Sequence, residues 1–119
     1  MSKRDIKAFL WDILKSIEKI EKWTKDTEFD EFVKDELLQD AIIRNLEIIG
    51  EACRYIPDDI RSKYPQIPWR RIVGFRNILI HKYFGIDYET TWFVIKNELP
   101  IFKEDFKKIL EDIEENQNK

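Results

Sequence analysis

The segment RNILIHKY, residues 76–83, carries the side chains best suited to chemistry: Arg76, Asn77, His81 and Tyr83. If this segment is helical, Asn77 and His81 are four residues apart and share a face, whereas Arg76 and Tyr83 share another. Arg76 and His81 lie about 140° apart around an ideal helix, which turns by roughly 100° per residue. They can converge if the long arginine side chain reaches across, or if the helix unwinds near His81.

These residue types suit cleavage of RNA without a metal ion. A histidine can take the proton of a ribose 2′-OH near neutral pH, and an arginine offers a planar fork of donors to the attacked phosphate. We therefore predict that His81 is the acid/base residue, Arg76 the phosphate clamp and Asn77 an auxiliary. Cleavage needs a base and an acid, but the chain has one histidine. A homodimer with two motif copies in one cleft would supply both; the alternative is a structural histidine at a helix end.

Charge is unevenly distributed along the chain. The 21 Lys and Arg and 24 Asp and Glu residues give a net charge of −3, which excludes an overall basic protein that coats nucleic acid. Residues 54–82, however, hold seven basic and two acidic residues, a net +5, against −8 for the remainder. A local basic patch can bind phosphates while the whole protein stays acidic, although a solvated helix face is the alternative. The candidate RNA-binding residues are Arg61, Lys63, Arg70, Arg71 and Lys82.

Apolar periodicity predicts helices nearly everywhere, in a single domain over residues 1–119. One apolar stripe predicts a helix over about residues 3–24, and a wider stripe predicts a second helix over about 30–56. Pro57 should end the second helix, and an irregular connection with one helical turn should follow over 57–68. Pro68 should then open a third helix that runs to about Lys82 and ends near Gly85 in a left-handed cap.

A fourth helix of about 25 residues is expected after Asp87, whose side chain can cap it. Pro100 lies inside its apolar pattern, so we expect a kink or a break there. Only three Gly and four Pro are present, which argues against a turn-rich β fold. The predicted fold class is all-α, a four- to five-helix up-and-down bundle.

No pattern in the chain indicates a cofactor, a metal site or a membrane segment. Glu47 and Glu51 could form a carboxylate pair, but no His or Asp stands at metal-binding spacing, so we interpret them as surface or interface polarity. No stretch approaches the ~20 apolar residues of a membrane span, and the charged N-terminus does not read as a signal peptide. We therefore expect a cytoplasmic protein, with Cys53 reduced and part of the core.

The run RNILIHKYFGID resembles the signature of HepT-like toxins, within the HEPN (higher eukaryote and prokaryote nucleotide-binding) superfamily. The family pattern is Arg, four residues, His, one residue, Tyr, which Arg76, His81 and Tyr83 match; Asn77 matches the polar position after the Arg. The resemblance extends to RNLEIIGEA at 44–52, where Glu51 could support the cleft, to IPWRRIVGFRN at 67–77 and to WFVIKNELPIF.

This resemblance implies an α-helical bundle that dimerises, with the two motif copies facing each other across a cleft. It implies a metal-independent ribonuclease, the toxin of a type VII-like toxin–antitoxin pair, with RNA, such as tRNA, as substrate. The antitoxin partner would be a nucleotidyltransferase that transfers AMP from ATP to Tyr83. AMP adds bulk and about one negative charge per phosphodiester beside the phosphate site, which would oppose RNA binding.

Two other classes of function stay open from the sequence. The chain could be a non-catalytic all-α module that binds a nucleotide or docks onto a nucleotidyltransferase. It could also be purely structural, with the broad apolar face of the second predicted helix serving for dimerisation. Cleavage of RNA by the unmodified protein separates both from the ribonuclease hypothesis.

Overall fold

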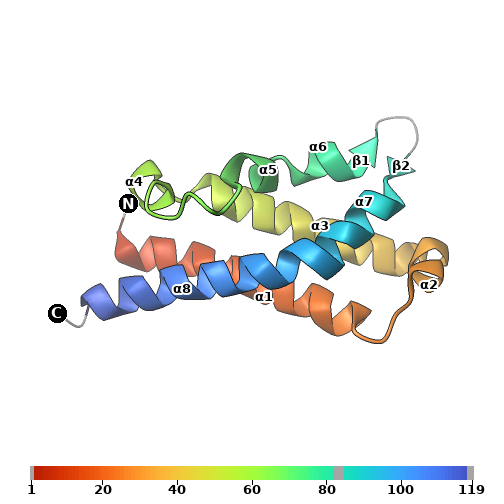
Figure 1. The fold of residues 1–119 in the computed structure, drawn as a ribbon, viewed down its shortest axis with the longest axis horizontal. Helices are drawn as coiled ribbons and strands as arrows, with labels where there is room; N and C mark the ends of the chain where they lie inside the picture. Colours follow the sequence, from red (N-terminus) through yellow and green to blue (C-terminus); the bar gives the residue numbers. More distant parts are fainter. Residues whose placement is uncertain (1, 82–84, 118–119) are drawn as a thin grey trace.

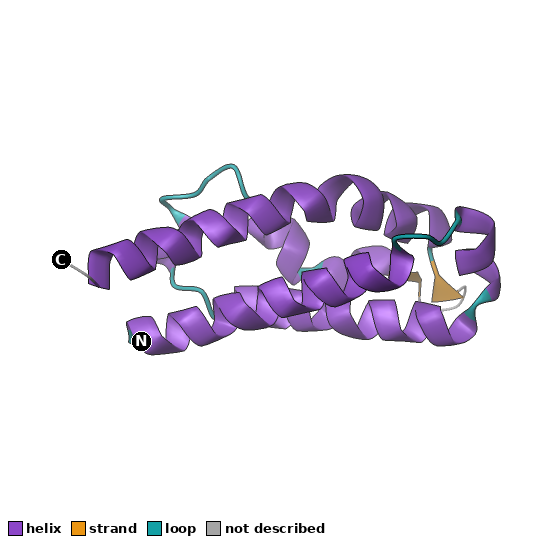
Figure 2. Ribbon diagram, turned by 90° about the horizontal axis from the view of Figure 1, so that it is seen from below, coloured by secondary structure: helices purple, strands orange, loops and turns teal. Residues whose placement is uncertain are grey.

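The computed structural model describes residues 2–81 and 85–117, and nearly all of this part of the chain is helical. Its long segments run in alternating directions along one axis, so that the N-terminus and the C-terminal end of the last helix lie at the same end (Figures 1 and 2). In chain order the elements are α1 (Lys3–Thr24), α2 (Phe29–Lys34), α3 (Glu36–Arg54), α4 (Asp58–Arg61), α5 (Trp69–Val73), α6 (Phe75–Leu79), β1 (Ile80–His81), β2 (Gly85–Ile86), α7 (Tyr88–Phe93), a π-helical turn (Val94–Glu98) and α8 (Leu99–Gln117).

The predicted first helix is confirmed as α1. The Ser2 hydroxyl caps it by accepting from the Asp5 amide at 3.2 Å, which satisfies one of the free N–H groups of the first turn. Its apolar stripe packs against α3 and α8, where Leu10, Ile13 and Ile17 are fully buried. This burial of one face stabilises the helix more than its intrinsic propensity does.

The prediction of one continuous helix over 30–56 is wrong, because the chain breaks at Asp35. Asp35 has an extended conformation, ends α2 with an N–H bond to the Phe32 carbonyl, and caps α3 by accepting from the Leu38 amide at 3.0 Å. The Gln39 side-chain amide closes the corner by donating to the Phe32 and Val33 carbonyls. The break turns α2 across the end of the bundle (Figure 1).

The predicted third helix, from Pro68 to Lys82, is also wrong beyond Leu79. It is divided at Gly74 into α5 and α6, and Ile80 is extended, with φ −120° and ψ 119°. β1 then pairs antiparallel with β2, with Ile80 opposite Ile86 and His81 opposite Gly85. Gly85 is left-handed, as predicted, with φ +76°, but it serves a β-hairpin rather than a helix end.

The C-terminal segment is a long, irregular helical rod. Asp87 caps α7 as predicted, since its side chain accepts from the Thr90 amide at 3.0 Å. The expected irregularity at Pro100 is confirmed as the π-helical turn that directly precedes α8. A proline has no N–H for the carbonyl four residues earlier and its ring clashes there, so a wider turn relieves the conflict.

The all-α fold class is confirmed, with the two-residue strands β1 and β2 as the exception in the described residues. The core is one cluster of buried aliphatic and aromatic residues from α1, α3, α5, α6 and the C-terminal rod. Cys53 belongs to it, and burial raises the pKa of its thiol to about 12. Within residues 2–81 and 85–117, no helix is long and apolar enough to cross a membrane.

Candidate active site

The motif residues lie on two consecutive elements at one end of the bundle. Arg76 and Asn77 are exposed on α6, and His81 is exposed on β1, next to the point where α7 begins. Figure 1 shows this hairpin projecting beyond α6, at the same end of the molecule as α2. Because α6 ends at Leu79, the prediction that Asn77 and His81 share a helix face is wrong. Tyr83, the predicted modification site, and Lys82 lie outside the described residues.

Arg76 and Asn77 line a polar cavity of about 220 Å³ between α6 and α3. The α3 side of this cavity carries both acidic and basic groups, namely Glu47, Glu51 and Arg54. Glu51, for which its place in the RNLEIIGEA segment indicated a supporting role near the cleft, thus lines the cavity that holds Arg76, and the role itself stays a prediction. The exposed guanidinium of Arg76 therefore stands where a phosphate or a carboxylate could reach it from solvent.

A close approach of two backbones positions this cavity. A Cβ atom on Gly50 of α3 would lie 2.8 Å from the Ile72 carbonyl oxygen and 3.2 Å from that of Val73. Glycine is therefore required for α3 to rest against the end of α5. Ile72 and Phe75 are fully buried on either side of Gly74, which anchors the segment carrying Arg76.

His81 lines a different cavity, of about 520 Å³, formed by α2, β2 and the start of α7. Its walls are largely apolar, and the polar residues beside the imidazole are Asp87, Tyr88 and Glu89. The His81 Nε2 atom is 3.6 Å from Asp87 Oδ2, an ion-pair distance when the ring is protonated. Arg76 and His81 thus face separate cavities of one described chain, rather than a single pocket.

The Asp87 carboxylate is held in place by Thr90. The Thr90 amide donates to Oδ1 at 3.0 Å and the Thr90 hydroxyl donates to Oδ2 at 2.8 Å. These hydrogen bonds, and then the charge of the nearby His81 ring, hold the pKa of Asp87 below its usual value. The carboxylate is therefore an ionised acceptor beside the imidazole. The sequence analysis identified Asp87 only as a helix cap. If Gly85 had been interpreted as part of a β-hairpin, the sequence would also have predicted that Asp87 lies beside His81.

Two of the predicted RNA-binding arginines make internal contacts. The Arg61 guanidinium donates to the Ile56 carbonyl at 2.9 Å, and to the Cys53 and Arg54 carbonyls at 2.7 and 3.0 Å, which caps the end of α3. Arg71 forms a bidentate pair with Glu98, at 3.0 and 2.7 Å.

The other predicted RNA-binding residues of the described chain lie on the surface. Lys63 and Arg70 are exposed, so their charges are presented to solvent. Together with the internal contacts of Arg61 and Arg71, this makes the accessible positive charge of the basic segment smaller than the sequence count indicates. Their role in RNA binding stays a prediction.

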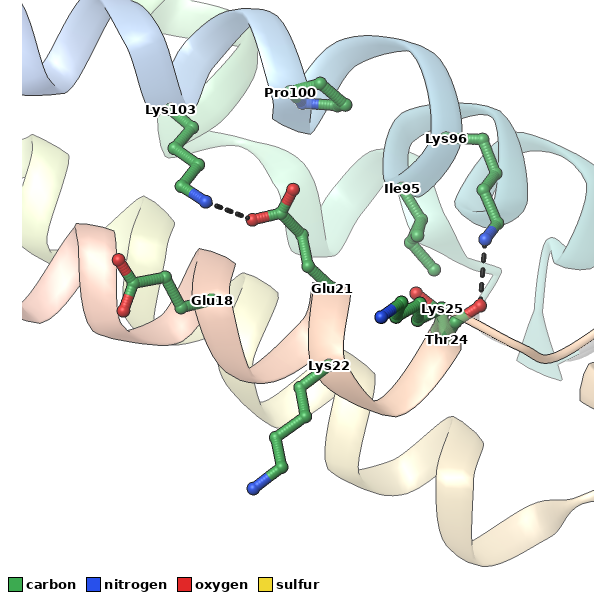
Figure 3. Close-up of a pocket in the computed structure, with 9 residues that line it drawn as sticks. All are labelled: Glu18, Glu21, Lys22, Thr24, Lys25, Ile95, Lys96, Pro100 and Lys103. Carbon is green, nitrogen blue, oxygen red and sulfur yellow. Dashed lines mark hydrogen bonds and ion pairs between the residues drawn. The ribbon is translucent and has the colours of Figure 1, made fainter.

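A further groove, of about 460 Å³, lies between the end of α1 and the C-terminal rod, away from the motif (Figure 3). Lys96 donates to the Thr24 carbonyl at 2.9 Å, and Lys103 pairs with Glu21 at 2.9 Å. These contacts join α1 to the rod, and the Lys103–Glu21 pair neutralises one charge of each sign in the groove. Across the described ranges, no group of three or more His, Cys, Asp or Glu residues is arranged to hold a metal ion.

Comparison with known proteins gives consistent matches over most of the chain. A family model described as ribonuclease HepT-like matches residues 13–109. A protein of Methanocaldococcus jannaschii named "Putative RNase" is 53% identical over 105 residues, which cover 88% of this chain and 96% of that protein. A second "Putative RNase" of the same organism is 51% identical over 115 residues, which cover 97% of this chain and 99% of that protein. A "Probable ribonuclease HepT" of Thermococcus cleftensis is 44% identical over 107 residues, which cover 90% of this chain and 97% of that protein. No solved structure matches the chain.

Proposed function

Because the chain belongs to the HepT-like ribonuclease family, we propose that it is a metal-independent endoribonuclease and the toxin of a toxin–antitoxin pair. The observation that carries this proposal is the exposure of Arg76, Asn77 and His81 at one end of the bundle, inside the segment that the family model matches. We propose that His81 transfers protons, that Arg76 binds the phosphate and that Asn77 assists it.

In the proposed reaction, a neutral His81 imidazole takes the proton of a ribose 2′-OH. The 2′-oxygen forms a bond to the adjacent phosphorus, and the bond from phosphorus to the 5′-oxygen breaks. The leaving 5′-oxygen takes a proton from an imidazolium, so that the products are a 2′,3′-cyclic phosphate and a 5′-hydroxyl. The Arg76 guanidinium would stabilise the extra negative charge on the phosphate in the transition state.

We propose that the active species is a homodimer. One chain supplies one imidazole, and Arg76 and His81 face separate cavities, so a second copy would complete the site. A candidate interface adjoins the Arg76 cavity, since Glu47 and Glu51 also line a hollow of about 370 Å³ between α1 and α3. Its apolar part contains the stacked rings of Phe9 and Tyr55, and Tyr55 is 48% exposed.

We also propose a nucleotidyltransferase antitoxin as partner, acting in the cytoplasm by transfer of AMP to Tyr83. The support is the family membership and the match of Tyr83 to the family pattern. Tyr83 follows His81 by two residues, so AMP attached there would bring bulk and negative charge close to the proposed proton-transfer group. RNA, with tRNA as one candidate, is the proposed substrate, and Lys63, Arg70 and Lys82 are the basic residues proposed to guide it.

The test is cleavage of RNA by freshly purified, unmodified protein in the presence of a chelator. We expect the wild type to cleave and His81→Ala to lose at least ~100-fold in rate, because proton transfer contributes about 10²–10⁴-fold. Lys107→Ala, a change at a half-buried surface position on α8, is the matched control and should cleave like the wild type. Circular dichroism should show that both variants are folded. Equal cleavage by His81→Ala would contradict the assignment, and a folded wild type without cleavage would favour the binding-module hypothesis.

A further inference from the structure

We propose that Asp87 is the positioning residue of the His81 imidazole, fixing the orientation and the tautomer of the ring for proton transfer. The inference rests on the proposed function, in which His81 is the acid/base residue. It assigns to Asp87 a role beyond capping α7, and it is carried by the geometry of the hairpin and of the first turn of α7.

The hairpin brings the two side chains together. His81 on β1 lies opposite Gly85 on β2, and the Asp87 amide donates to the Leu79 carbonyl at 2.8 Å, which ties the base of the hairpin. The backbone hydrogen bonds of the hairpin therefore fix the relative positions of the His81 and Asp87 Cα atoms. Asp87 Oδ2 then lies 3.6 Å from His81 Nε2, and in the described ranges His81 is the one basic residue within ion-pair distance of Asp87.

Thr90 fixes the carboxylate independently of the imidazole. It donates its amide to one oxygen and its hydroxyl to the other, at 3.0 and 2.8 Å, so the side chain of Asp87 is restrained at both oxygens. Each carboxylate oxygen has two lone pairs, so Oδ2 can accept from the imidazole while it accepts from Thr90. A restrained, ionised acceptor is what orienting an imidazole requires.

The chemistry follows from which ring nitrogen faces the carboxylate. An Nε2–H that donates to Asp87 leaves Nδ1 with a free lone pair, so Nδ1 is the atom that takes the 2′-OH proton. After proton transfer, the carboxylate stabilises the imidazolium. The present distance is longer than a hydrogen bond, and such contacts tighten when substrate is bound.

Other groups at this cavity do not duplicate Asp87. Glu89, in the first turn of α7, and the Tyr88 phenol are its remaining titratable groups among the described residues. In the described part of the chain, neither group lies within ion-pair distance of the ring, and α2 contributes only the apolar side chains of Phe29 and Val33 to this cavity. A change in pH dependence on substitution of Asp87 therefore reports the Asp87–His81 pair.

The test uses the full chain with Asp87→Asn, because asparagine caps helices as well as aspartate, while it removes the charge and replaces the acceptor oxygen beside the imidazole with an NH2 donor. We expect the rate constant for cleavage of bound RNA to fall about 10- to 100-fold, with KM changed less than about twofold. Both limbs of the pH–rate profile should move to lower pH by a few tenths of a unit, because the positive ring loses its stabilising neighbour. Thr90→Val, which keeps the amide donor but removes the hydroxyl, should give a smaller fall in the same direction.

The matched control is Asp35→Asn, the same substitution at the cap of α3. It should leave the rate and the pH profile unchanged. An equal loss in both variants, or an unchanged profile in Asp87→Asn, would overturn the inference. A second readout needs no cleavage: because His81 is the only histidine, its ring nitrogens give unique ¹⁵N signals. The Nε2 signal should move in Asp87→Asn and not in Asp35→Asn; if it does not move, the inference fails even if the wild type cleaves RNA.

Discussion

Gly50→Ala should destabilise the protein, although alanine is the better helix former. In an exposed helix the change would stabilise by about 1 kcal/mol. Here the added Cβ would lie 2.8 Å from the Ile72 carbonyl oxygen and 3.2 Å from that of Val73. Both obstacles are backbone atoms, so neither can rotate away as a side chain would. The Ile72 carbonyl oxygen must move by roughly 0.6 Å, from 2.8 to 3.4 Å, to restore ordinary contact.

The expected magnitude is the difference between two opposing contributions. Overpacking of a well-packed contact costs about 1–3 kcal/mol, and a rigid backbone neighbour places this case near the upper end. Subtracting the propensity gain of about 1 kcal/mol leaves a net loss of about 2 kcal/mol in the free energy of unfolding. Because α5 leads directly into the segment with Arg76, we also expect slower RNA cleavage.

The assay is urea denaturation followed by circular dichroism, at one fixed protein concentration. Gly74→Ala is the matched control, since its Cβ would meet nothing closer than the Arg70 carbonyl oxygen at 3.4 Å and its φ is −94°. The control should change the free energy of unfolding by less than about 1 kcal/mol. If Gly50→Ala is as stable as the wild type, or more stable, the argument from close backbone approach is refuted.

Two further predictions concern contacts that the sequence did not reveal. Arg61→Ala should lower the free energy of unfolding by about 2 kcal/mol in urea denaturation, because the carbonyl groups at the end of α3 lose their charge-assisted hydrogen bonds. Lys63→Ala, the control at an exposed residue, should change it by less than about 0.5 kcal/mol. Equal effects of the two substitutions would contradict the capping role of Arg61. Tyr64→Phe should cost about 1 kcal/mol near pH 7, because the Tyr64 hydroxyl donates to the Asp112 carboxylate. This hydrogen bond lowers the pKa of Asp112, and burial followed by the same bond raises the pKa of Tyr64 to about 12. The free energy of unfolding should therefore differ less between wild type and Tyr64→Phe below about pH 4, where Asp112 becomes protonated. The same difference should shrink between about pH 10 and 12, where Tyr64 ionises. A difference that does not depend on pH would argue against the Tyr64–Asp112 hydrogen bond.

Much of the fold follows from local patterns in the sequence. The stripe of α1 predicted both its limits and its buried face, because one uninterrupted helical period runs from Ile6 to Ile20. Asp87 was recognisable as a cap, and Pro100 as a cause of irregularity, since each acts on the backbone within one turn of itself. Such effects depend on near neighbours and are visible without a tertiary structure.

The missed features depend on competition between structures that are locally similar. Apolar residues continue across Asp35, so the periodicity alone could not reveal that this residue ends one helix and caps the next. The run Ile78–Leu79–Ile80 fits a buried helix or a strand equally well at this length. The pairing of Ile80 with Ile86 and of His81 with Gly85 decides in favour of the hairpin.

The candidate site likewise has a part that the sequence predicted and a part that it did not. The motif itself identified Arg76, Asn77 and His81 as candidate site residues, and the structure places all three, exposed, at one end of the bundle. Their surroundings come from tertiary contacts: α3 supplies one cavity, and the first turn of α7 supplies the carboxylate beside the imidazole. Charge counting likewise could not foresee that Arg71 pairs with Glu98, 27 residues away.

The π-helical turn between α7 and α8 interrupts the regular hydrogen-bond ladder of the C-terminal rod. Its hydrogen bonds span five residues, as from the Leu99 amide to the Val94 carbonyl, and Pro100 offers no amide to the Lys96 carbonyl. We therefore expect local opening of the rod to begin there, with the amide hydrogens of α7 exchanging before those of α8, which is packed on α1.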